Sequence, residues 1–176
     1  MAAPVPIAHT HVHSLRILSG AEALVARVLT PEGVAGYGFT LNLDAAAARD
    51  MAAWDALARS RNVPLFALFG RKQRDPVAVV CGAQPVLSQV DPFALGSVEA
   101  VLGVARASPD ASIALVAPNT HAWELSYCAA LAASLPCRDA CIIVRAEPRI
   151  SAIEVPEGVG IGIDWPLEPG FGAIRW

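Results

Sequence analysis

Hydrophobic and polar residues alternate along the first forty positions in a way that predicts an antiparallel sheet. Residues 9–19 alternate enough to form a strand, and residues 22–29 predict a second one. Residues 30–33 read TPEG, a turn sequence, because proline pre-sets φ at the second position and glycine tolerates positive φ. Residues 34–41 are expected to pair back as a third strand.

A helical period follows this sheet. Met51, Trp54, Leu57 and Ala58 fall on one stripe of a helix. Asp44 precedes the stripe, and its carboxylate can accept from the exposed amides of a first helical turn. We therefore expect an amphipathic helix after Asp44 that packs on the sheet.

Beyond residue 75 the pattern changes to short apolar runs separated by helical stripes. The expected strands are residues 76–82, 85–90, 112–117 and 140–144. A helix is expected to begin after Ser97 as its N-cap, and another covers about residues 123–134. Strands that alternate with helices at this spacing are typical of βαβ units. The sequence therefore predicts an α/β fold with about four parallel strands.

Composition adds a large interior to this picture. The chain has 176 residues, of which 55% are hydrophobic and 16% charged, with a mean hydropathy of +0.47. Either the core is large for this length, or another subunit covers apolar surface. No apolar run approaches the ~18 residues of a membrane span, and the first residues do not resemble a signal peptide. With four cysteines in apolar contexts, we expect reduced thiols and a cytoplasmic protein.

Charge gives little indication of a nucleic-acid partner. The net charge is −3, and the basic residues scatter except at residues 71–74, RKQR, which we expect to form a solvated loop. His9, His11 and His13 share one face of the first strand, where three imidazoles can bind a transition metal. An exposed edge strand explains the same pattern and is preferred. Residues 158–162, GVGIG, lack the strand–helix context of a dinucleotide-binding loop.

Three segments carry a family resemblance. Residues 51–70 read MAAWDALARSRNVPLFALFG, residues 24–40 read LVARVLTPEGVAGYGFT, and residues 155–172 read VPEGVGIGIDWPLEPGFG. They resemble the enolase superfamily, in its mandelate racemase and muconate lactonizing branch. There, a helix ends a small capping domain, a V-P link leads into a catalytic barrel, and a closing segment returns to the cap. This chain has Phe39 where the family hairpin has a glutamate.

The resemblance implies a shortened barrel. Too few residues follow Gly70 for a (β/α)₈ barrel of ~250 residues. The four expected strands are similar to barrel strands one, six, seven and eight, which leaves strands two to five as the missing ones. The implied organisation is a shortened capping segment (1–75), a partial β/α barrel (76–150) and a C-terminal segment that packs back on the cap (151–176).

The missing strands are those that carry the family's chemistry. The superfamily removes a proton α to a carboxylate and stabilises the enediolate on Mg²⁺, using a lysine or histidine base. The resemblance implies catalytic lysines at the end of strand two and metal carboxylates at the ends of strands three to five. Here the one lysine is Lys72, before the first barrel strand. We therefore expect no cofactor, although Mg²⁺ is the family's metal.

Asp91 and His121 match a surviving part of that chemistry. They resemble the Asp–His dyad of mandelate racemase, in which the carboxylate orients the imidazole that serves as a base. The alternative interpretation is that Asp91 caps a turn before Pro92 and that His121 is a polar loop residue.

Two functions follow from these observations. The first is a relative of the family without its catalysis, acting in binding or assembly. The second is a residual isomerase or racemase that acts on a small carboxylic acid with His121 and Asp91, with a site completed across a dimer. In both, an open partial barrel exposes edges and apolar surface, so a homodimer or larger assembly is expected.

Overall fold

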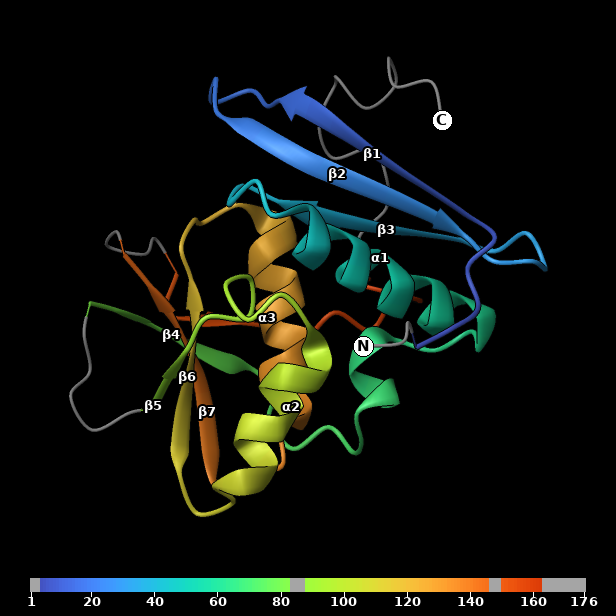
Figure 1. Cartoon of the computed structure of the whole chain (residues 1–176). Helices are drawn as coiled ribbons and strands as arrows, with labels where there is room; N and C mark the ends of the chain where they lie inside the picture. The colour runs from blue at the N-terminus through green and yellow to red at the C-terminus, as the bar shows by residue number, and fades with distance from the viewer. Residues whose placement is uncertain (1–3, 83–87, 146–149, 163–176) are drawn as a thin grey trace.

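The computed structural model of the chain describes residues 4–82, 88–145 and 150–162. These residues form two sheets with helices packed between and beside them (Figure 1). One sheet has three strands in the order β1-β2-β3, and the other has five in the order β5-β6-β7-β4-β8. The fold is mixed α/β, as the sequence predicts.

The N-terminal sheet is antiparallel throughout. Its strands are β1 (His9–Arg16), β2 (Glu22–Leu29) and β3 (Ala35–Thr40). Helix α1 (Ala45–Ser60) follows, and Asp44 caps it by accepting from the Ala46 amide at 2.8 Å. The three strands, the helix and its cap residue confirm the sequence prediction.

Two glycines let α1 lie directly against β3. A Cβ atom on Gly36 would clash with the backbone oxygen of Ala52, and one on Gly38 would clash with that of Ala48. The alanines of α1 contribute to the same contact, because Ala48 and Ala52 are fully buried beneath β2. Small residues on both sides therefore bring the two backbones together.

The free edge of β3 is closed by side chains rather than by another strand. Alternate amides along β3, and the amide of the residue just after it, point away from β2 and donate to two helices. The pairs are Tyr37 to Asp55 Oδ2 at 2.9 Å, Phe39 to Met51 Sδ at 3.3 Å, and Leu41 to Glu124 Oε1 at 2.9 Å. An edge that would otherwise invite pairing with another chain is thereby satisfied internally.

The second sheet contains the four expected parallel strands and one that the sequence did not predict. Its elements, with the helices between them, are η1 (Leu65–Leu68), β4 (Val77–Cys81), β5 (Ser88–Val90), α2 (Val98–Ala107), β6 (Ser112–Ala117), α3 (Ala122–Ser134), β7 (Asp139–Val144) and β8 (Ala152–Ile153). Strands β5, β6, β7 and β4 are mutually parallel, whereas β8 runs antiparallel to β4. Ser97 caps α2 as expected, accepting from the Ala100 amide at 3.3 Å. Residues 83–87, part of which was expected in β5, lie outside the described residues.

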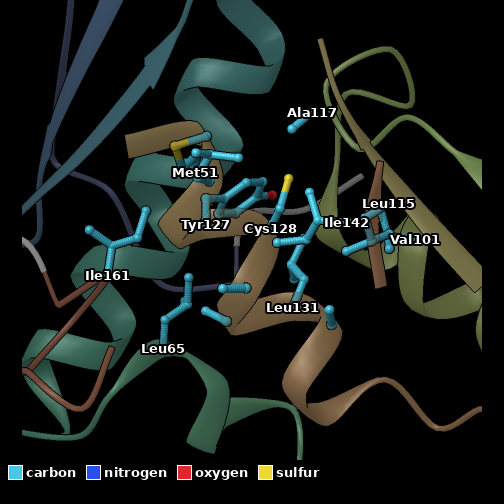
Figure 2. Close-up of a cluster of buried hydrophobic side chains, with 14 of the residues drawn as sticks. Met51, Leu65, Val101, Leu115, Ala117, Tyr127, Cys128, Leu131, Ile142 and Ile161 are labelled. Atoms are coloured by element: carbon cyan, nitrogen blue, oxygen red, sulfur yellow. The ribbon is translucent and has the colours of Figure 1, made fainter. Parts of the chain in front are cut away.

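Helix α3 is the centre of the core. It lies between α1 and the parallel sheet, so Met51 reaches it from one side and Leu115 and Ile142 from the other (Figure 2). Eleven residues of α3 are buried. A helix that is apolar all round is one enclosed on every side.

The basic cluster at residues 71–74 forms a loop, as expected, in which Arg71 and Gln73 are exposed and the other two side chains have partners in the chain. Arg74 donates to the carbonyl oxygen of Ala132, in the last turn of α3, at 3.0 Å, and to that of Cys137, just after the helix, at 2.6 Å. A guanidinium there satisfies carbonyls that the helix leaves without partners. Lys72 is also engaged, in ion pairs with Asp75 and Glu157.

The described part of the C-terminal segment packs against α1 and the link after it. The Leu65 amide donates to Gly160 O at 2.6 Å, and the Ile161 amide donates to Asp55 Oδ1 at 2.8 Å. The sequence beyond residue 162 lies outside the described residues. Among the described residues, no helix is both long and apolar enough to cross a membrane.

Candidate functional site

The sequence-predicted residues lie at the carboxyl end of the parallel sheet. Asp91 directly follows β5, and residues 118–121 follow β6. These two strands are neighbours and parallel, so the residues after them meet at one edge. In open α/β sheets this edge is where ligands bind. Here Phe39 and Leu41, at the end of the N-terminal sheet, lie against it.

Asp91 organises its own loop. Its Oδ1 accepts from the amide of Phe93 at 2.9 Å and from that of Ala94 at 3.0 Å. This is the local pattern in which an aspartate side chain mimics a backbone turn. The turn-capping interpretation of Asp91 is therefore confirmed, and it uses one of the two carboxylate oxygens.

His121 is the N-cap of α3 and not a simple loop residue. Its Nδ1 accepts from the Trp123 amide at 3.2 Å, so this nitrogen carries no proton in the observed arrangement. The imidazole also stacks on the Phe39 ring, with centroids 4.4 Å apart and planes inclined by 20°. Both contacts hold the ring between the helix and the cap sheet. A catalytic role for the pair of His121 and Asp91 stays a prediction.

Glu124 is the residue that the sequence analysis missed. Its side chain is fully buried in the first turn of α3, and its Oε1 accepts from the Leu41 amide at 2.9 Å. Burial raises the pKa of Glu124, and the charge of Asp91 adds to this, while hydrogen bonds from Leu41 and Asn119 act in the opposite direction. The spacing His121-x-x-Glu124 resembles a capping box, which is the one local signal for it.

The neighbourhood of these residues is acidic and buried. Burial is the main cause that raises the pKa of the Cys128 thiol, and the charges of Glu124 and Asp91 contribute. Asp91, Glu124 and Cys128 therefore lie within electrostatic reach of one another beneath the N-terminal sheet. Burial of this kind favours the neutral form of Glu124 over its anion.

The residues that the structure describes do not provide a Mg²⁺ site of the kind that the enolase superfamily uses. A hard cation needs several oxygen ligands that converge from rigid positions. Among the described residues, no group of three or more histidine, cysteine, aspartate or glutamate side chains could hold a metal ion. The three N-terminal histidines lie on β1, the edge strand of its sheet, as the preferred interpretation expected.

Comparison with solved structures identifies the fold. The chain is similar to an enolase protein from environmental genome shotgun sequencing of the Sargasso Sea, with 13% identity, a TM-score of 0.55, and coverage of 94% of this chain and 97% of that one. At this identity the likeness shows the fold alone. The chain thus has an enolase-like α/β fold, in which an antiparallel sheet lies over the carboxyl edge of a parallel sheet.

A protein-family model also matches the N-terminal part of the chain. Residues 17–70 match the family model described as mandelate racemase / muconate lactonizing enzyme, N-terminal domain. This part of the chain is therefore similar to the N-terminal domain of the mandelate racemase and muconate lactonizing enzymes. No curated protein matches it.

Two other solved structures to which the chain is similar are about twice as long. The chain covers 55% of a mandelate racemase/muconate lactonizing enzyme from Jannaschia sp. CCS1, with 84% of this chain aligned, 16% identity and a TM-score of 0.38. It covers 52% of a dipeptide epimerase from Methylococcus capsulatus complexed with Mg ion, with 80% of this chain aligned, 18% identity and a TM-score of 0.36. The chain thus spans about half the length of these two proteins.

Proposed function

We propose that this protein is a relative of the mandelate racemase and muconate lactonizing enzymes that lacks their catalysis and acts in binding or assembly. The contact between Phe39 and His121 is the observation that carries the proposal. It brings an apolar ring of the cap sheet onto the imidazole that would serve as the base. The Phe39 ring occupies one face of the imidazole, so a carboxylic acid substrate could not approach the base from that face.

The lysine content supports the same proposal. The chain has one lysine, and its ammonium group pairs with Asp75 and Glu157 at 2.8 and 2.6 Å. Lys72 precedes β4, so it lies outside the strand ends where the family's base is expected. A histidine acting alone would supply ~10²–10⁴ in rate, which is far less than removal of a proton from an unactivated carboxylic acid requires.

The proposed architecture is a capping segment (1–75), a partial barrel (76–150) and a returning C-terminal segment (151–176). Strand order supports it, because β4 pairs in parallel with β7, the last strand of the parallel set. In a closed barrel the first and eighth strands pair in this way. The order β5-β6-β7-β4 is therefore the one expected if barrel strands six, seven, eight and one remain.

Self-association is the form of assembly that we propose. The face of the parallel sheet opposite the helices carries a row of Val80, Ile143 and Val116, which are aligned across β4, β7 and β6. Val80 and Val116 are partly exposed. A second copy of the chain would cover this apolar row.

The experiment that tests the loss of catalysis follows exchange of α-protons with deuterated solvent. The full chain is incubated with a panel of small carboxylic acids, with and without Mg²⁺, and the substrate signal is followed by proton NMR. The proposal predicts no exchange above the protein-free rate. Exchange that requires the protein would contradict it.

The alternative is a residual isomerase that uses the predicted pair of His121 and Asp91. Their positions after neighbouring parallel strands support it. Under this alternative, protein-dependent exchange is abolished by His121→Asn. Because His121 also caps α3, the variant's fold has to be verified by its near-ultraviolet circular dichroism.

A further inference from the structure

A second concave site lies away from the carboxyl edge of the sheet. It is a pocket of about 300 Å³ between α1, the first turn of α2 and η1. Figure 1 shows these three elements close together on the side of the chain's N-terminus. Its longest wall is α1, which contributes Asp50, Trp54, Leu57 and Arg61. Their spacing of four, three and four residues places them on one face of the helix.

One end of the pocket is acidic. Asp50 and Glu99 line it together. Burial raises the pKa of Asp50, and the nearby charge of Glu99 adds to this. Asp50 Oδ2 accepts from the Val98 amide at 2.8 Å, and no ion pair with Asp50 occurs among the described residues. Glu99 has a loose, exposed contact with Arg106 at 3.5 Å. This end therefore carries negative charge that, in the described part of the chain, only the exposed pair of Glu99 with Arg106 offsets.

The middle of the pocket is apolar but contains an unsatisfied donor. Trp54, Leu57 and Leu68 line it. The indole of Trp54 packs edge-on against Phe69 and is 8% exposed. Its N–H lies near enough to Asp50 to lower the pKa of that carboxyl, yet it makes no hydrogen bond of good geometry with any described residue. A buried donor without an acceptor is costly, and a ligand oxygen or a water removes that cost.

The other end of the pocket is cationic. Arg61 lines it from the C-terminal end of α1, and its side chain is exposed. Asp50 and Arg61 are eleven residues apart, which corresponds to about 16 Å along a helix axis. The long arginine side chain shortens this gap, and Trp54 and Leu57 lie between the two ends, so a ligand that meets both ends needs opposite charges separated by an apolar chain.

We propose that this pocket binds an ω-amino acid, with its ammonium group at Asp50 and Glu99, its methylene chain on Trp54 and Leu57, and its carboxylate at Arg61. The two ends have opposite charge, so a zwitterion complements both, whereas a simple amine or a simple acid complements one. The pocket is separate from His121, and this inference does not rest on the proposed loss of catalysis.

The test is a titration of the full chain with 6-aminohexanoate, followed by ¹⁵N NMR of the tryptophan indole signals. Trp54→Phe assigns the indole signal of Trp54. We expect saturable shifts of this signal at millimolar ligand. Hexylamine and hexanoate, which each lack one of the two charges, should bind about fivefold more weakly or worse.

Variants separate the two ends of the pocket. Glu99→Gln and Arg61→Gln should each weaken binding of 6-aminohexanoate by about fivefold. Arg49→Gln is the matched control, because Arg49 is exposed on α1 but does not line the pocket. No saturable shift at millimolar ligand would overturn the proposal, as would equal binding of hexylamine or equal effects of Arg49→Gln and Arg61→Gln.

Discussion

At the scale of single residues, buried carboxylates connect parts of the chain that are distant in sequence. Asp55 accepts from the amides of Tyr37 and Ile161 at 2.9 and 2.8 Å, and from Arg59 Nε at 2.7 Å. Burial raises the pKa of Asp55, as it does for Asp50. These side chains are acceptors for backbone amides that no strand or helix satisfies. For Asp55 this role is architectural, because its three hydrogen bonds connect β3, α1 and the C-terminal segment.

Asp50 should make stability depend on pH. Burial raises its pKa from 3.8 to about 6, so folding favours its protonated form. The stability that it contributes is present below pH 3.8 and is lost as the pH rises through about 6, a change of about 2–3 kcal/mol. Urea unfolding at a series of pH values should show this decline in wild type. In the Asp50→Asn variant the free energy of unfolding should decline less over this pH range, because the contribution of Asp50 is absent.

The control for this prediction is Asp110→Asn, at an exposed position after α2. Its pH profile should retain the decline between pH 4 and 6. Parallel profiles for wild type and Asp50→Asn would show that the account of Asp50 is wrong.

Glu124 should matter as an acceptor rather than as a charge. Glu124→Ala leaves the Leu41 amide without its partner, and we expect a loss of about 2 kcal/mol in the free energy of unfolding. Glu124→Gln keeps an oxygen and removes a charge that burial disfavours, so it should be nearly neutral. Urea denaturation measures both. Equal losses in the two variants would argue for an electrostatic role instead.

At the scale of elements, the fold depends on the close contact between α1 and β3. The sequence predicted both elements from local patterns, together with the caps Asp44 and Ser97, because these signals lie within a few residues. It could not predict β8, which has two residues and no periodicity of its own. Nor could it predict the contact of Glu124 with Leu41, since these residues are 83 positions apart. Tertiary partners of this kind leave no local pattern.

The α1–β3 contact gives a sharp prediction for a small substitution. Gly36→Ala places a methyl group against the backbone of α1 at Ala52, where neither element can yield easily. We expect a loss of about 3 kcal/mol in the free energy of unfolding. Gly103→Ala in α2 is the control, because open space surrounds that position and alanine favours helix by about 0.5–1 kcal/mol. Equal unfolding temperatures for Gly36→Ala and Gly103→Ala would contradict this packing.

At the scale of the whole molecule, the two sheets differ in how their described edges are satisfied. The cap sheet has its β3 edge satisfied by side chains, whereas the parallel sheet ends in β5 on one side and β8 on the other. Strand β8 occupies part of the outer edge of β4. Two copies would therefore meet by their apolar faces more readily than by pairing these edges into one closed barrel.

Self-association through this face is testable by sedimentation velocity. Wild type should sediment as a dimer or larger assembly at micromolar concentration, and Val80→Asp should shift it to monomer by placing a charge in the apolar row. Val104→Asp is the control, because Val104 is 37% exposed on α2, on the other side of the sheet. A monomeric wild type would refute the proposed assembly.

The central proposal is that this chain combines a cap similar to that of the mandelate racemase and muconate lactonizing enzymes with part of a sheet, without the metal chemistry of those enzymes. Isothermal titration of the full chain with Mg²⁺ tests it most directly, with thermal unfolding at the same concentrations as a second readout. The account predicts no saturable heat and no rise in the unfolding temperature at millimolar Mg²⁺, because the described residues provide no group of ligands for it. Stoichiometric binding with a matching rise in the unfolding temperature would contradict it.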